Sequence, residues 1–82
     1  MWSVYIIRCA DGTFYTGIST DVGRRFMEHS MGSPKSAKYL RGRTPLKLIY
    51  QRAIGTRSEA TIEECRIKGL TKAQKIRLVA NL

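Results

Sequence analysis

The feature that most constrains the fold is a hairpin signal at Asp11-Gly12. Two runs rich in β-branched and aromatic residues, residues 2–8 and 13–18, lie on either side of it. Glycine tolerates the positive φ angle that a tight turn needs, so this dipeptide predicts that the chain reverses here. The two runs should therefore pair as antiparallel strands.

The length of the turn decides which side chains share a face, because a shift of one residue turns a whole strand over. A two-residue loop would place Tyr5 and Tyr15 on opposite faces. A three-residue loop with Gly12 in the left-handed conformation pairs Tyr5 with Gly17 and places both phenols on one face. We favour this second register, in which Gly17 leaves an open floor beside the two hydroxyls.

Helical spacing replaces the alternating pattern after residue 20. Asp21 or Thr20 can cap a helix whose apolar residues recur at i and i+4. At 100° per residue, Arg25 and His29 project beside this apolar stripe. We expect both side chains at the rim between the helix and the sheet.

These residues resemble the GIY-YIG nuclease family, whose name records two strand motifs, here Val4-Tyr5-Ile6 and Tyr15-Thr16-Gly17. Val4 replaces the glycine of the first motif, so its tyrosine carries the match. In the family an arginine follows the second motif by about two helical turns, and many members place a histidine one turn further on. Arg25 and His29 match these places. The likeness covers nearly the whole chain and is closest to small stand-alone bacterial members.

Composition favours a nucleic-acid partner. Fifteen Lys and Arg against six Asp and Glu give a net charge of +9, which attracts polyanions. A chain of 82 residues predicts one domain over residues 1–82 with a single modest core. No apolar run is long enough to span a bilayer and no secretory signal is present, so we expect a cytoplasmic protein with no membrane partner.

A segment rich in glycine and positive charge, residues 31–44, follows the first helix, and we expect it to be a mobile connection. Its cations could contact phosphates while an aromatic ring stacks on an unpaired base. A solvated basic loop with the ring packed on the domain edge is an equal alternative, although the small bacterial members that this chain resembles carry a similar segment. The candidate nucleic-acid-binding residues are Lys35, Lys38, Tyr39, Arg41 and Arg43, together with Lys68 in a later helix.

The second half of the chain predicts one more strand and two further helices. Residues 46–52 alternate as a strand that returns antiparallel beside the first, with Leu46, Leu48 and Tyr50 on one side. Capping boxes at residues 56–59 and 71–74 open the helices, and Ala73, Ile76 and Ala80 should pack in the last one. The predicted fold is thus a small α/β domain of the α+β type. It has a three-stranded antiparallel sheet, a central first strand and three to four flanking helices.

One acid falls in an apolar stripe. Glu64 shares a helix face with Ala60 and Ile67, where an unpaired carboxylate is costly and needs a cation or a polar partner. Four other acids are accounted for by the turn (Asp11), a cap (Asp21), a capping box (Glu59) and an exposed helix face that points to solvent (Glu28), which leaves Glu64 and Glu63. A single Mg²⁺ or Mn²⁺ ion keeps most of its waters and needs one carboxylate plus substrate oxygens. In the GIY-YIG family a helix glutamate fills that role, and Glu64 matches its local pattern.

The resemblance implies a divalent-metal-dependent endonuclease that hydrolyses DNA in repair or in the processing of branched or single-stranded DNA, with RNA left open. Arg25 would neutralise the phosphate, and Tyr5 or Tyr15 would orient or deprotonate the attacking water. His29 titrates near neutrality and could assist proton transfer. The rival interpretations are a non-catalytic nucleic-acid-binding domain and an adaptor that docks to a larger repair complex. We expect a monomer or a weak dimer.

Overall fold

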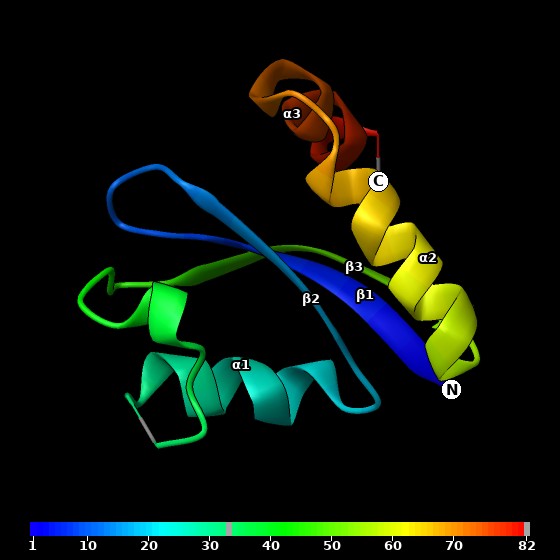
Figure 1. The fold of residues 1–82 in the computed structure, drawn as a ribbon. Coiled ribbons are helices and arrows are strands. Elements are labelled where there is room, and N and C mark those ends of the chain that lie inside the picture. Colours follow the sequence, from blue (N-terminus) through cyan, green and yellow to red (C-terminus); the bar gives the residue numbers. More distant parts are fainter. Residues whose placement is uncertain (33, 82) are drawn as a thin grey trace.

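The computed structural model describes residues 1–32 and 34–81, and it confirms the predicted fold class. Its strands form one antiparallel sheet in the order β2-β1-β3, with the first strand in the centre (Figure 1). The elements in chain order are β1 (Trp2–Arg8), β2 (Phe14–Ser19), α1 (Val22–Ser30), the short 3-10 helix η1 (Lys38–Leu40), β3 (Lys47–Gly55), α2 (Arg57–Lys68) and α3 (Lys72–Ala80).

The hairpin adopts the register with the three-residue turn. Tyr5 lies opposite Gly17, and Ile7 lies opposite Tyr15. The amide of Cys9 donates to the carbonyl oxygen of Thr13 over 2.8 Å, and Gly12 takes a φ of 83°. A left-handed glycine at the end of the turn therefore sets the face on which both tyrosines lie.

The predicted face of the third strand is wrong beyond Leu48, because β3 contains a bulge. Ile6 pairs with Tyr50 but Ile7 pairs with Leu48, so Ile49 is an extra residue. A bulge breaks the strict alternation of side chains. Leu48 packs beside Ile7 on one face, whereas Tyr50 packs beside Ile6 on the other. The strand also runs on to Gly55 instead of ending at residue 52.

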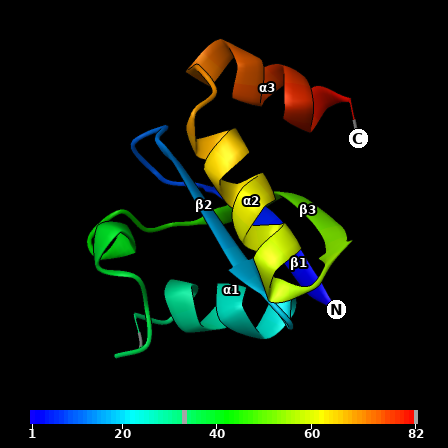
Figure 2. The same cartoon turned by 45° about the vertical axis from the view of Figure 1, so that its right-hand side comes forward.

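Helices cover both faces of the sheet, as the two views of the fold show (Figures 1 and 2). One core contains Tyr5, Ile7, Cys9, Val22 and Leu40, with side chains from α1 and residues 37–46 packed around it. The other contains Val4, Ile6, Tyr50 and Ile67, with side chains from α3 packed around it. The tyrosine face therefore belongs to the core beneath α1.

The helices begin where the sequence predicts. Asp21 caps α1 by accepting from the amide of Arg24, and complete capping boxes at Thr56 and Thr71 open α2 and α3. The packing face of α3 differs from the prediction. Its residues at 73, 76 and 80 are exposed, whereas Leu78 and Val79 pack on the sheet.

The two cysteines differ in burial: Cys9 is buried, whereas Cys65 is exposed on α2. Among residues 1–32 and 34–81, no helix has the length and apolar character to cross a membrane.

Candidate active site

The two strand tyrosines form the centre of the site. Their rings lie on the same face with centroids 6.5 Å apart and planes tilted by 44°. Tyr5 is 2% exposed, while Tyr15 is half-buried. The central strand thus carries the deeper phenol and the edge strand carries the more accessible one.

The expected open floor beside Gly17 is absent, because the ring of Tyr5, its cross-strand partner, covers the glycine. A Cβ atom built on Gly17 would lie 2.6 Å from the hydroxyl oxygen of Tyr5 and 2.7 Å from its Cζ. The phenol of Tyr5 therefore lies directly across the glycine. The absent side chain makes room for the catalytic candidate itself, because any larger residue would displace that ring.

His29 is buried against Tyr5 and is 1% exposed, not at the rim. Its Nε2 lies 3.1 Å from the hydroxyl oxygen of Tyr5, and its Nδ1 accepts from the backbone amide of Ala37 over 3.1 Å. Burial, assisted by the charge of Arg25 and opposed by Glu28, lowers the pKa of His29 to about 4. The expectation that this histidine titrates near neutrality is wrong, because a buried imidazole beside a guanidinium resists protonation.

Arg25 lies between the helix and the following segment. Its Nη1 donates to Glu28 over 3.3 Å and to the carbonyl oxygen of Lys35 over 2.5 Å. The expectation that Glu28 points away to solvent is wrong, since its side chain is 22% exposed and pairs with Arg25. The guanidinium is thus oriented by groups on both sides.

The two adjacent acids of α2 have different partners. The carboxylate of Glu63 accepts two hydrogen bonds from Arg66, at 2.5 and 2.9 Å, and lies near Arg52. Glu64 pairs with Lys68 at 3.5 Å, and its side chain is 19% exposed. A bidentate guanidinium occupies Glu63, so Glu64 is the acid better placed to receive a further cation.

Several of the candidates act on the hydroxyl of Tyr5. Its pKa is raised to about 12, chiefly by burial and also by Tyr15, while the charge and hydrogen bonding of Arg25 oppose the rise. The carboxylate of Glu64 also raises it. Two strands, α1 and α2 therefore bring a phenol pair, a guanidinium and a carboxylate within electrostatic reach of one hydroxyl.

The basic segment is anchored to the domain, contrary to the expectation that it is mobile. Leu40 is 1% exposed and belongs to the core beneath α1. The amide of Ala10 donates to the carbonyl oxygen of Arg43 over 2.9 Å, and the guanidinium of Arg43 pairs with Asp11 in the hairpin turn. Residue 33 lies outside the described residues. Residues 34–43 form one wall of the site, where Tyr39 stacks on Tyr15.

The candidate nucleic-acid contacts on this wall differ in how far they are engaged. The ring of Tyr39 stacks with Tyr15 at a centroid distance of 5.9 Å, and the guanidinium of Arg43 lies 4.4 Å from its centre. A base that stacks on Tyr39 must therefore compete with these partners. Lys35, Lys38 and Arg41 have exposed side chains, and the ammonium of Lys35 lies 4.0 Å from the carboxylate of Glu28. The ammonium of Lys68 faces Glu64.

A single hard cation fits the donors present. Within the described part of the chain, no group of three or more His, Cys, Asp or Glu side chains could enclose a metal ion. Mg²⁺ needs no such cage, because it keeps several waters and binds through one or two carboxylates together with phosphate oxygens. The half-buried carboxylate of Glu64 meets that requirement.

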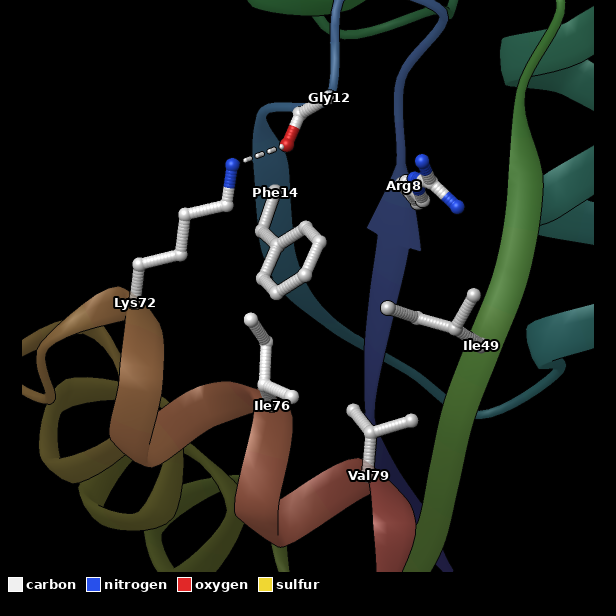
Figure 3. A pocket seen from close by; sticks show the side chains of 7 residues that line it. All are labelled: Arg8, Gly12, Phe14, Ile49, Lys72, Ile76 and Val79. Carbon is white, nitrogen blue, oxygen red and sulfur yellow. Dashed lines mark hydrogen bonds between the residues drawn. The ribbon is translucent and has the colours of Figure 1, made fainter.

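A separate cavity of about 470 Å³ lies between α3 and the sheet (Figure 3). Phe14, Ile76 and Val79 point into it, and the ammonium of Lys72 closes one side by donating to the carbonyl oxygen of Gly12 over 2.9 Å. None of the tyrosine-site residues lines it. This cavity is therefore distinct from the candidate active site.

The family model described as the GIY-YIG catalytic domain matches residues 1–77. The chain belongs to the GIY-YIG family. This membership confirms the resemblance seen in the strand motifs and supports an endonuclease-type function.

Relatives within the GIY-YIG family are similar over almost the whole chain. A UPF0213 protein of Cronobacter sakazakii is 54% identical over 96% of this chain and 81% of its own length. The UPF0213 protein YhbQ of Escherichia coli K12 is 52% identical over 96% of this chain and 77% of its own.

Two solution NMR structures share the fold. The UPF0213 protein BH0048 from Bacillus halodurans is 43% identical with a TM-score of 0.60, over 98% of this chain and 84% of its own. Protein EF2693 from E. faecalis is 37% identical with a TM-score of 0.64, over 96% of this chain and 82% of its own.

Two partners in the site were missed by sequence reasoning. Ala37 acts through its backbone amide, which no residue pattern marks, and Glu28 was assigned to an exposed face. The i, i+3 spacing of Arg25 and Glu28 is a signal that could have found the second partner.

Proposed function

We propose that this protein is a divalent-metal-dependent endonuclease that hydrolyses DNA phosphodiester bonds, with branched or single-stranded DNA as the substrate class. One observation carries the proposal. The ring of Tyr5 lies 6.5 Å from that of Tyr15 on the same face, its hydroxyl lies 3.1 Å from Nε2 of His29, and the charges of Arg25 and Glu64 both affect its pKa. Phosphodiester hydrolysis needs charge stabilisation, an oriented water and help for the leaving oxygen, and these groups supply candidates for each.

Arg25 is the group that meets the phosphate. A guanidinium stays charged at any relevant pH and can bind two phosphate oxygens at once. In the free protein it is held by Glu28 and by the carbonyl oxygen of Lys35, so it is oriented before substrate arrives. Substrate phosphate would replace one of these partners.

The tyrosines orient the water. A pKa of about 12 keeps Tyr5 protonated near neutrality, so it acts as a hydrogen-bonding group unless bound cations lower that pKa. Tyr15 is more exposed and remains the alternative water-orienting phenol. Single Tyr5→Phe and Tyr15→Phe variants separate the two roles, because the one that orients water loses turnover and keeps DNA affinity.

Glu64 would hold the metal ion. Bound there, Mg²⁺ or Mn²⁺ would supply positive charge to the phosphate oxygens in the transition state. The Glu64→Gln variant keeps the shape of the side chain and removes its charge. Glu63→Gln is the matched control, because it changes a neighbouring acid that Arg66 already occupies.

The decisive assay incubates the protein with labelled branched, duplex and single-stranded DNA and with single-stranded RNA. Each is tested with Mg²⁺, with Mn²⁺ and with chelator. We expect cleavage that needs the metal and that falls at least about 100-fold in Glu64→Gln but not in Glu63→Gln, with binding retained in both. Cleavage that survives chelation, or equal loss in both variants, contradicts the proposal.

A second candidate is a non-catalytic nucleic-acid-binding domain, and a third is an adaptor that docks to a larger repair complex. The net charge of +9 and the exposed cations of the basic segment favour the binding domain. It predicts affinity that falls steeply with salt and is unchanged in Glu64→Gln, without cleavage of any substrate. An adaptor that acts through proteins alone would show neither cleavage nor strong affinity for polyanions.

A further inference from the structure

The imidazole of His29 has two hydrogen-bond partners of different kinds. A backbone amide can only donate, so the amide of Ala37 requires an unprotonated Nδ1 on the histidine. An imidazolium carries a proton on both nitrogens and would direct one of them at that amide. The geometry therefore excludes the charged form, in agreement with the lowered pKa of this residue.

The single proton of the neutral ring must then lie on Nε2. That nitrogen is 3.1 Å from the hydroxyl oxygen of Tyr5, so Nε2–H donates and the phenol oxygen accepts. The hydroxyl proton of Tyr5 is left free to donate to another group. The ring of Tyr5 also lies across Gly17, which blocks movement toward the strand.

We infer that His29 is a positioning residue: the backbone of the basic segment fixes its tautomer through Ala37, and the imidazole in turn aligns the hydroxyl of Tyr5. The histidine is then a hydrogen-bond donor toward the phenol, and it does not accept the phenol's proton. A donor at this place also stabilises any negative charge that develops on the phenol oxygen.

The same stretch of backbone contacts a second member of the proposed site. The carbonyl oxygen of Lys35 accepts from Arg25, two residues before the amide that holds His29. Residues 35–37 thus align both the guanidinium and the phenol. Nucleic acid that contacts the exposed cations of this segment would therefore affect the positions of the Arg25 guanidinium and the Tyr5 hydroxyl. This last step rests on the proposed endonuclease function, whereas the tautomer does not.

Nuclear magnetic resonance tests the tautomer directly. The chain contains one histidine, so long-range ¹H–¹⁵N correlation spectra of the uniformly labelled protein give one set of ring signals. Near neutral pH we expect an unprotonated Nδ1 and a protonated Nε2. A protonated Nδ1, a charged ring, or rapid exchange between tautomers would overturn the inference.

A substitution at residue 37 tests the alignment. Ala37 has φ −60° and ψ 136°, which proline also adopts, so Ala37→Pro removes the amide hydrogen with little change in backbone angle. Ala37→Gly is the matched control because it keeps that hydrogen. In Ala37→Pro we expect a mixture of tautomers and a loss of roughly 10- to 100-fold in kcat with KM unchanged, the effect of a misplaced catalytic group.

The outcomes separate the inference from the proposed function. The expected tautomer in a protein that cleaves nothing would support the hydrogen-bond assignment and reject the nuclease. Cleavage by a protein whose histidine has the opposite tautomer would support the nuclease and reject the hydrogen-bond assignment. If Ala37→Pro does not fold, as judged by its amide spectrum, the tautomer in the unmodified protein still decides. A folded Ala37→Pro with unchanged tautomer and turnover would overturn the alignment.

Discussion

Burial of His29 should make the stability of the domain depend on pH between about 4 and 6.5. In the unfolded chain His29 titrates near its ordinary pKa of 6.5, whereas burial and Arg25 lower its pKa in the folded state to about 4. The unfolded chain therefore binds more protons between these values, so the free energy of unfolding rises with pH there. The contribution of His29 to the free energy of unfolding is therefore fully present above pH 6.5 and is lost as the pH falls toward 4.

The size of the effect follows from the two pKa values. Each unit of difference corresponds to 1.36 kcal/mol, so the complete contribution is about 3 kcal/mol. Between about pH 7.5 and pH 5 the loss should be about 2 kcal/mol. That is a large fraction of the roughly 5–15 kcal/mol that stabilises a typical domain. The carboxylates of Asp11, Glu59 and Glu63 interfere little in this range, because their pKa values are lowered from values that are already acidic.

Urea unfolding at a series of pH values, followed by circular dichroism, measures this loss. His29→Gln is the control, because it removes the chain's one histidine and should flatten the profile between about pH 5 and pH 7.5 whatever its overall stability. A flat profile in the unmodified protein would refute the reasoning. It would mean that His29 protonates equally well in the folded and unfolded states, and hence that the imidazole is not enclosed.

Four further predictions concern single positions. Gly17→Ala should destabilise the domain by about 1–3 kcal/mol and reduce turnover, because the new methyl group displaces the ring of Tyr5; urea unfolding and a cleavage assay measure both effects. Leu40→Ala should cost about 2–5 kcal/mol in the same unfolding assay, whereas a mobile segment would lose almost nothing. Thr56→Ala should cost about 1 kcal/mol at the start of α2 with cleavage unchanged. Lys38→Ala should weaken DNA binding for all sequences and reduce the salt dependence of binding by about one counterion, as fluorescence titration would show.

The parts of the fold that the sequence predicted depend on interactions between near neighbours. The hairpin register follows from the positive φ of Gly12, and the starts of α2 and α3 follow from capping boxes within four residues. Each of these signals lies within a few consecutive residues, so the sequence alone is enough to predict the turn or the helix start. The family motifs then located the tyrosine face on this hairpin.

The errors came from features that depend on distant parts of the chain. The bulge at Ile49 places Leu48 and Tyr50 on opposite faces of the sheet, and no residue pattern within β3 predicts it. The packing face of α3 depends on how the helix crosses the sheet, which places Val79 inward and Ile76 beside a cavity. Periodicity gives the direction of a side chain relative to its own helix, but it does not say what lies opposite.

His29 shows the difference between direction and depth most clearly. Its spacing from Arg25 places both residues on the sheet side of α1, as predicted, but its burial requires residues 34–46 to close over it. That closure depends on Leu40, an apolar residue within a segment whose charge and glycine content favour a mobile loop. Once Leu40 is in the core, the amide of Ala37 reaches the imidazole and the histidine becomes part of the interior. Burial of Leu40 therefore holds the basic segment against the domain, where it forms one wall of the site. The same closure buries His29, which then acts as a hydrogen-bond donor and no longer titrates near neutrality.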